Sequence, residues 1–228
     1  MLNTLIIKFN NAINYNEIPL FRGAVIGAIG SECNELFHNH RGDGYRYSYP
    51  MIQYKRIRGC AAIVCVGQGT EVIGAFFNTG HFIFKLGELR EEKFVIDMIK
   101  TRRTEVQVWD EDFRYTLRDW LPFNSENYHR YIVCEGIVER TSLLEQIWVG
   151  NVLSMCKGLG ISVEREIKCK IVSLNEPRKV YYKGVPMMSF SCELTSNITL
   201  PDHIGIGKGA SMGHGIIVRQ RRMNNEKQ

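Results

Sequence analysis

Two apolar segments in the N-terminal half limit most strongly what this chain can fold into. Residues 50–57 and 60–66 have the composition of β-strands, and Arg58-Gly59 between them allows a tight turn. The second segment, Cys-Ala-Ala-Ile-Val-Cys-Val, contains no charged or amide side chain. A strand of this kind is covered on both faces, so we expect it at the centre of a sheet with a layer on each side.

The segments on either side of this hairpin extend the pattern. Residues 2–9 form a compact apolar run typical of a strand. Asn16 and Pro19 are helix-start signals, and apolar residues at helical spacing follow from 20 to 29. We expect a short second helix at 67–77 and further strand residues within 94–109. Strand, helix, strand, strand, helix, strand is the order of the ferredoxin-like fold.

The second half repeats this theme less clearly. Ser142 and Glu145 form a capping-box pattern, which predicts a helix that begins there and ends near Gly158 or Gly160. Strands are predicted at residues 113–121, 131–138, 167–174, 180–194 and 215–221. The predicted fold class is α+β, with two tandem ferredoxin-like (RRM-like) domains at 1–110 and 111–228.

Composition sets the broad class of the protein. A hydrophobic fraction of 44% and a charged fraction of 23% are ordinary for a globular chain. The net charge of +5 fits a polyanionic partner and plain solubility about equally well. Seven scattered cysteines without a Cys-x-x-Cys pair predict free thiols in a reducing compartment and no structural zinc. The sequence has no signal peptide or membrane-span pattern, so we expect a cytoplasmic protein.

A glycine-rich segment precedes the last predicted strand. It runs Gly-Ile-Gly-Lys-Gly-Ala-Ser-Met-Gly-His-Gly from residue 205 to residue 215. Glycines let the main chain approach a ligand closely, and successive backbone N–H groups can then hold phosphate oxygens. The spacing matches neither a Walker loop nor a dinucleotide fingerprint. A flexible loop or hairpin without a ligand is the alternative.

Two motifs together resemble a known family. The pattern Gly-hydrophobic-Gly, five residues, Gly-x-Gly near the C-terminus resembles the signature loop of the RAMP superfamily of CRISPR proteins. Leu-Phe-His-Asn-His at 36–40, followed by Tyr-Pro-Met-Ile-Gln-Tyr-Lys at 49–55, resembles the b-type branch of CRISPR repeat-processing endoribonucleases. The resemblance implies a metal-independent ribonuclease without a cofactor. It would cut CRISPR repeat RNA and leave a 2′,3′-cyclic phosphate and a 5′-hydroxyl.

His38 and His40 are the candidate catalytic residues. RNA cleavage without a metal needs a base for the 2′-hydroxyl and an acid for the leaving 5′-oxygen. Histidine titrates near neutral pH and can serve as either. The resemblance favours His40 as the principal residue and His38 as its helper, with acid and base unassigned. A solvated, idle pair and a zinc pair are the alternatives.

Tyrosines and basic residues follow the histidines. Among Tyr45, Tyr47, Tyr49 and Tyr54, the resemblance favours Tyr47 beside the reacting phosphate, while packing at a sheet edge is the alternative. Lys55 would stabilise the charged transition state. The predicted RNA contacts are Gly205, Gly207, Lys208, Gly209, Ser211, Gly213, Gly215, Arg56 and Arg58. Two further basic clusters, at 100–103 and 219–222, would contact phosphates or remain solvated.

The expected partners follow from the resemblance. They are CRISPR repeat RNA and, as a second possibility, proteins of a CRISPR effector complex, with the chain a monomer or a homodimer. Two other functions stay open. A non-catalytic RNA-binding subunit would share the fold and the glycine-rich segment and would not need the histidines. A nucleotide-binding enzyme would use the glycine-rich segment for a mononucleotide phosphate.

Overall fold

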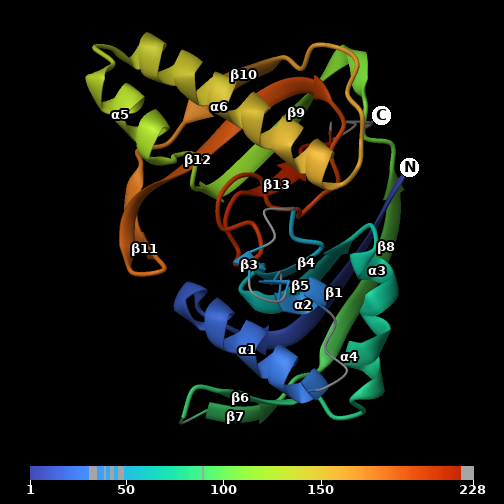
Figure 1. The fold of residues 1–228 in the computed structure, drawn as a ribbon. Helices are drawn as coiled ribbons and strands as arrows, with labels where there is room; N and C mark the ends of the chain where they lie inside the picture. The colour runs from blue at the N-terminus through green and yellow to red at the C-terminus, as the bar shows by residue number, and fades with distance from the viewer. Residues whose placement is uncertain (31–34, 39, 42–43, 46–48, 89, 222–228) are drawn as a thin grey trace, which may run out of the picture.

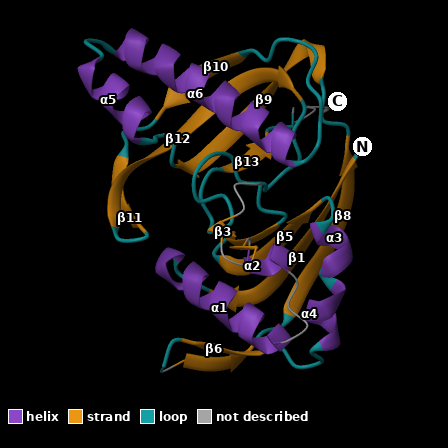
Figure 2. Cartoon of the chain, viewed as in Figure 1, coloured by secondary structure: helices purple, strands orange, loops and turns teal. Residues whose placement is uncertain are grey.

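The computed structural model describes residues 1–30, 35–38, 40–41, 44–45, 49–88 and 90–221, with the backbone alone for 38, 40, 41, 44 and 45. Two antiparallel sheets lie one above the other, with helices on their outer sides (Figures 1 and 2). The glycine-rich segment lies between them (Figure 1). In the part of the chain that is described, no helix is both long and apolar enough to span a membrane.

The first sheet confirms the predicted N-terminal pattern. Its strands are β1 (Leu2–Ala12), β4 (Ile52–Ile57), β5 (Cys60–Val66) and β8 (Ile96–Thr104), paired in the order β4-β5-β1-β8. This is the antiparallel strand order of a ferredoxin-like domain. Arg58 and Gly59 make the turn between β4 and β5 with φ values of 51° and 86°. A turn with two positive φ values matches the right-handed twist of the strands.

The remaining N-terminal elements are short, apart from one helix. That helix is α1 (Ile18–Ile29), which starts with a proline in its first turn, as predicted. Two helices, α3 (Gly69–Val72) and α4 (Gly74–Asn78), replace the single helix expected at 67–77. The others are the 3-10 turn Tyr15–Glu17, α2 (Glu35–His38), β2 (His40–Arg41), β3 (Gly44–Tyr45), β6 (Ile83–Leu86) and β7 (Arg90–Lys93).

Alternation along the strands divides the apolar residues of the first sheet between two cores. On β1, Leu5, Ile7 and Phe9 face α1 and α4, where Phe9 meets Phe21 with ring centroids 5.7 Å apart. Leu2 and Ile6 face the second sheet. On β5, neighbouring buried residues alternate between the same two cores. The prediction of a central strand covered on both faces is therefore confirmed.

The second sheet has the same strand order as the first. Its strands are β9 (Val108–Trp120), β10 (Cys169–Leu174), β11 (Arg178–Tyr182), β12 (Val185–Ile198) and β13 (Ile216–Arg219). The central path is β10-β12-β9-β13, with β11 paired to β12. Residues 199–215, which contain the glycine-rich segment, connect the third strand of this domain to its fourth. A ferredoxin-like domain has its second helix at that place.

Two helices cover the outer face of the second sheet, and they correct the sequence predictions. They are α5 (Ser125–Val133) and α6 (Ile137–Gly158), so the strand predicted at 131–138 is wrong. Asn124 caps α5 by accepting a hydrogen bond from the backbone N–H of Asn127 at 2.7 Å. The predicted helix start at Ser142 is wrong too, because α6 begins five residues earlier, at Ile137. The strand predicted at 180–194 is a hairpin that turns at Lys183-Gly184.

Candidate functional site

The predicted catalytic histidines lie on the connection between α1 and β4. His38 is the last residue of α2, and His40 is the first residue of β2. β2 pairs with β3 in a small hairpin in which His40 lies opposite Tyr45. Tyr47 lies outside the described residues. The side chains of His38 and His40 are not described either, so their catalytic roles stay predictions.

This hairpin is tethered close to the glycine-rich segment. Tyr49 follows Tyr45 by four residues, which limits their Cα separation to about 14 Å. The hydroxyl of Tyr49 donates a hydrogen bond to the backbone oxygen of Gly205 at 2.9 Å. The chain that follows the hairpin is thus hydrogen-bonded, through Tyr49, to the start of the glycine-rich segment, although some 155 residues separate Tyr49 from Gly205 in the sequence.

Three of the glycines predicted to contact RNA are buried against the protein itself. They are Gly205, Gly213 and Gly215. A Cβ added at Gly215 would lie 1.9 Å from the backbone oxygen of Ile206, and one at Gly213 would lie 2.6 Å from Ile18. Gly215 also has a φ of 63°, which a residue with a side chain rarely adopts. At these positions glycine is required for internal packing.

The outer part of the segment is accessible. Lys208 is exposed, and Gly207, Gly209 and Ser211 are half-buried. The backbone N–H of Lys208 donates to the backbone oxygen of Leu121 at 3.3 Å, which attaches this part of the segment to the end of β9. Lys208 therefore holds its charge outward on a fixed main chain, an arrangement that suits contact with a phosphate.

Lys55 lies under the segment. Its side chain is fully buried, and its Nζ donates to the backbone oxygen of Ala210 at 3.2 Å. Burial lowers the pKa of Lys55 to about 7, because a charged ammonium is costly away from water. Lys55 thus contacts the glycine-rich segment from the inside.

The two arginines next to Lys55 differ in exposure. Arg56 is half-buried: its Nε donates to the backbone oxygen of Ile13 at 2.7 Å, and its guanidinium lies 5.0 Å from the ring centre of Tyr15. Arg58 is exposed in the β4–β5 turn. Arg58 is therefore free of the packing that holds Arg56, and it presents its charge to solvent.

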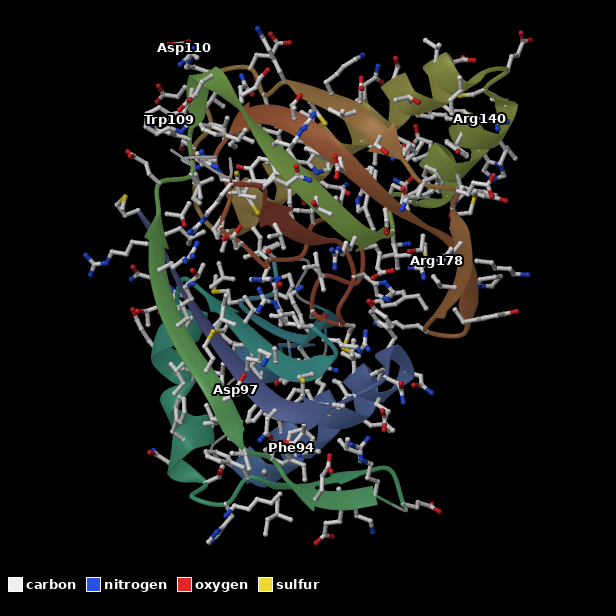
Figure 3. The ribbon with its side chains drawn as sticks, turned by 180° about the vertical axis from the view of Figure 1, so that it is seen from behind. Phe94, Asp97, Trp109, Asp110, Arg140 and Arg178 are labelled. Atoms are coloured by element: carbon white, nitrogen blue, oxygen red, sulfur yellow. The ribbon has the colours of Figure 1, made fainter. Side chains whose placement is uncertain are left out.

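A groove of about 820 Å³ lies where the chain passes from the first sheet to the second, and its lining includes the carboxylates of Glu111, Asp112 and Asp202. Figure 3 shows this passage from behind, with β8 running past Asp97 and turning into β9 beside Trp109 and Asp110. Four arginines line the groove: Arg102, Arg114, Arg219 and Arg221. The structure thus brings together residues of the two basic clusters at 100–103 and 219–222, which lie far apart in the sequence, and it adds Arg114, which no sequence pattern marked.

An aspartate orders part of this groove. Asp202 pairs with Arg102 at 2.8 Å and accepts the backbone N–H of Arg219 at 2.8 Å. The guanidinium of Arg219 lies 4.2 Å from the ring centre of Phe113. In the described residues Arg114 and Arg221 have no ion pair, so their charges are available to a polyanion.

Two further histidines lie at the glycine-rich segment, His203 just before it and His214 within it. His203 and His214 both have lowered pKa values, chiefly because they are largely buried. Nδ1 of His214 is 3.2 Å from the backbone oxygen of Asp119, and its ring packs edge-on against Tyr182. No group of three or more His, Cys, Asp or Glu side chains suited to a metal ion is found among the described residues.

The fold and these contacts define the class of protein to which the chain belongs. This is a protein of two tandem ferredoxin-like domains, the fold class predicted from the order of its strands and helices, and the glycine-rich segment of its second domain packs against the first. A family description of the Cas6b N-terminal domain matches residues 1–105, and one of the Cas6b C-terminal domain matches residues 107–220. The chain belongs to the Cas6b family.

Individual proteins are similar to this chain in sequence or in fold. An uncharacterized protein of Methanocaldococcus jannaschii is 31% identical over 145 residues, which are 61% of this chain and 97% of that protein. A crystal structure of Cas6b is 24% identical, covers 96% of this chain and all of its own, and has a TM-score of 0.84. A crystal structure described as CRISPR RNA processing endoribonuclease Cas6b is 23% identical, covers 96% of this chain and 99% of its own, and has a TM-score of 0.72.

Proposed function

We propose that this chain is an endoribonuclease that binds the repeat of a CRISPR transcript and cleaves it once without a metal ion. The observation that carries the proposal is the match of both halves of the chain to Cas6b. The N-terminal match contains His38 and His40, and the C-terminal match contains the glycine-rich segment. A structural neighbour described as a CRISPR RNA processing endoribonuclease supports the same activity.

The proposed reaction is a transesterification within the RNA. A base takes the proton of the 2′-hydroxyl, the 2′-oxygen attacks the adjacent phosphorus, and the bond from phosphorus to the 5′-oxygen breaks. An acid gives its proton to that leaving oxygen. The products are a 2′,3′-cyclic phosphate and a 5′-hydroxyl. We assign the two proton transfers to His40 and His38 and place Tyr47 beside the scissile phosphate.

RNA binding is assigned to the accessible basic residues. Lys208, Gly209 and Ser211 on the outer part of the glycine-rich segment, together with exposed Arg58, would contact phosphates near the cleavage site. The groove with Arg114 and Arg221 would hold a more distant part of the strand. Lys55 would support the phosphate indirectly, because its amino group holds the segment from beneath.

The test is a cleavage assay with end-labelled repeat RNA from the host's own CRISPR array, in excess EDTA. We expect one cut by the wild-type protein, a cyclic-phosphate end, and a rate at least about 100-fold lower for His40→Ala. As a matched substrate control, the same RNA with a 2′-deoxynucleotide at the cut site should bind with unchanged affinity and stay intact, since it lacks the nucleophile.

Three outcomes would revise the proposal. If the wild-type protein binds the RNA and never cuts it, the chain is a binding subunit. Loss of cleavage in EDTA that magnesium restores would replace the metal-independent mechanism. Equal cleavage by the wild type and His40→Ala would move the active site away from the histidine hairpin.

A further inference from the structure

Gly205, the first residue of the glycine-rich segment, has both of its backbone polar groups held by side chains of the other domain. Its N–H donates to Oε1 of Gln53 at 2.9 Å, and its oxygen accepts from the hydroxyl of Tyr49 at 2.9 Å. Gln53 is fully buried, and Tyr49 is only 9% exposed. Buried hydrogen bonds of this kind fix a distance, because a polar group left without its partner there is costly.

The carboxamide of Gln53 also contacts the end of the histidine connection. Its Nε2 donates to the backbone oxygen of Pro50 at 2.9 Å, and Pro50 directly follows Tyr49. One planar amide thus accepts from the glycine-rich segment and donates to the chain that leaves the histidine hairpin. Only a side chain with a donor and an acceptor on one rigid group can do both.

The neighbouring residues of β4 hold the rest of the segment. The backbone N–H of Tyr54 donates to the backbone oxygen of Ser211 at 2.9 Å, and Lys55 contacts Ala210. Gln53 and Lys55 face the second domain because side chains two apart on a strand point the same way. Tyr54 points to the opposite core, where its ring lies 6.1 Å from that of Phe21.

We infer that Gln53 and Tyr49 are positioning residues, which set the distance between the glycine-rich segment that holds RNA and the hairpin that carries His38 and His40. The inference rests on the proposed function. Neither residue touches the RNA in this scheme. Each fixes Gly205 relative to the point where the histidine connection joins β4, so the scissile phosphate is presented to the histidines at reacting distance. A displacement of about 1 Å in such an arrangement costs on the order of 100-fold in rate.

The test separates binding from the chemical step with two substitutions. Tyr49→Phe removes only the hydroxyl, and Gln53→Met removes both amide contacts while keeping an unbranched side chain of similar length. For each we expect a single-turnover cleavage rate about 10- to 100-fold below wild type at saturating protein. The dissociation constant for the 2′-deoxy repeat RNA should change less than about threefold, since the accessible phosphate contacts remain.

Tyr115→Phe is the matched control. The hydroxyl of Tyr115 is also buried and donates to a backbone oxygen at 2.9 Å, that of Ile198, but both residues belong to the second domain. The Tyr115 hydroxyl also accepts from the backbone N–H of Leu200 at 3.1 Å, so we expect this variant to lose at least as much thermal stability as Tyr49→Phe and to cleave within about threefold of the wild-type rate. Rate loss in Tyr49→Phe beyond that of Tyr115→Phe then reports positioning and not general loosening.

The outcomes are distinct from those of the proposed function. If the wild type does not cleave, the proposed function fails, whatever the variants do. If the wild type cleaves and folded Tyr49→Phe and Gln53→Met cleave equally fast, the positioning role is overturned. Rate and affinity falling by the same factor would also overturn it, because the two residues would then only maintain the binding surface.

Discussion

Lys55 carries a titratable group into the space between the two domains. Its Nζ donates a hydrogen bond to the backbone oxygen of Ala210, and the nearby His203 and His214 are also largely buried. Burial lowers the pKa of Lys55 to about 7, well below the value of a lysine in the unfolded chain. Because residue 55 binds a different number of protons in the folded and unfolded states, the free energy of unfolding depends on pH.

Lys55→Met should change the pH dependence of stability. Between pH 7 and about 10 the unfolded chain binds more protons at residue 55 than the folded protein does. The stability of the wild type should therefore rise with pH in this window, relative to the variant. Below pH 7 the full cost of burying the charge is present, on the order of a few kcal/mol. The measurement is urea unfolding at several pH values from 6 to 10.

Lys208→Met is the control for this experiment. Lys208 is exposed on the outer part of the same glycine-rich segment, so its removal should leave the difference from wild type constant across the pH range. A Lys55→Met difference that is equally independent of pH would show that residue 55 holds its proton through folding.

At the scale of elements, the glycine-rich segment combines two requirements in one stretch of chain. Its inner glycines let the segment fold back on itself, as where the N–H of Ile206 donates to the oxygen of Gly215 at 2.8 Å. Its outer part, around Lys208, remains accessible. Substitutions of the inner glycines should therefore lower stability, and substitutions of the outer part should weaken RNA binding.

Gly215→Ala tests the inner side. Both a positive φ and a Cβ position 1.9 Å from the oxygen of Ile206 oppose this change, so we expect a loss of about 2–5 kcal/mol in the free energy of unfolding. Gly184→Ala is its control, because Gly184 has a φ of 77° and open space around its Cβ position. We expect a cost of about 1–2 kcal/mol there. Equal losses in urea unfolding would mean that the segment moves to admit the methyl group.

Sequence patterns predicted two elements of the second domain wrongly. Ile132, Val133, Ile137 and Val138 are β-branched, which favoured a strand at 131–138, yet all four are exposed on α5 and α6. The cap at Asn124 stabilises α5, and packing of Trp148 and Leu144 against the sheet stabilises α6, so this part of the chain is helical. The hairpin at 178–198 had a readable signal in Lys183-Gly184, whose φ values are 51° and 77°.

At the scale of the whole molecule, arginines of both domains come together where the two sheets meet, beside three carboxylates. The chain has a net charge of +5, and the groove between β8 and β13 collects arginines from both domains. A single-stranded polyanion lying across this groove would contact both sheets at once. Salt should weaken that binding strongly, because counterions are released when arginines meet phosphates.

Arg114→Gln and Arg221→Gln test this surface. We expect each to weaken binding of the 2′-deoxy repeat RNA and to lower the slope of log K against log salt by about 0.7. Arg140→Gln is the control, since Arg140 lies on α6, away from this passage, against the ring of Tyr131 (Figure 3). Fluorescence anisotropy at several salt concentrations gives the slopes. A slope unchanged in both groove variants would remove the groove from the RNA path.

Local sequence patterns were sufficient to predict the strands of the first sheet, its ferredoxin-like order and the family. Periodicity and short motifs depend only on residues that are close together in the sequence. They also marked residues 205–215 as unusual. They could not distinguish the glycines that pack inward from the outer positions open to a ligand, nor show that Lys55 is buried. Those properties depend on Tyr49, Gln53 and Lys55 meeting a segment about 150 residues away, and contacts at that separation have no signature in local sequence. They exist only once the two sheets have packed together, since that packing removes the intervening water.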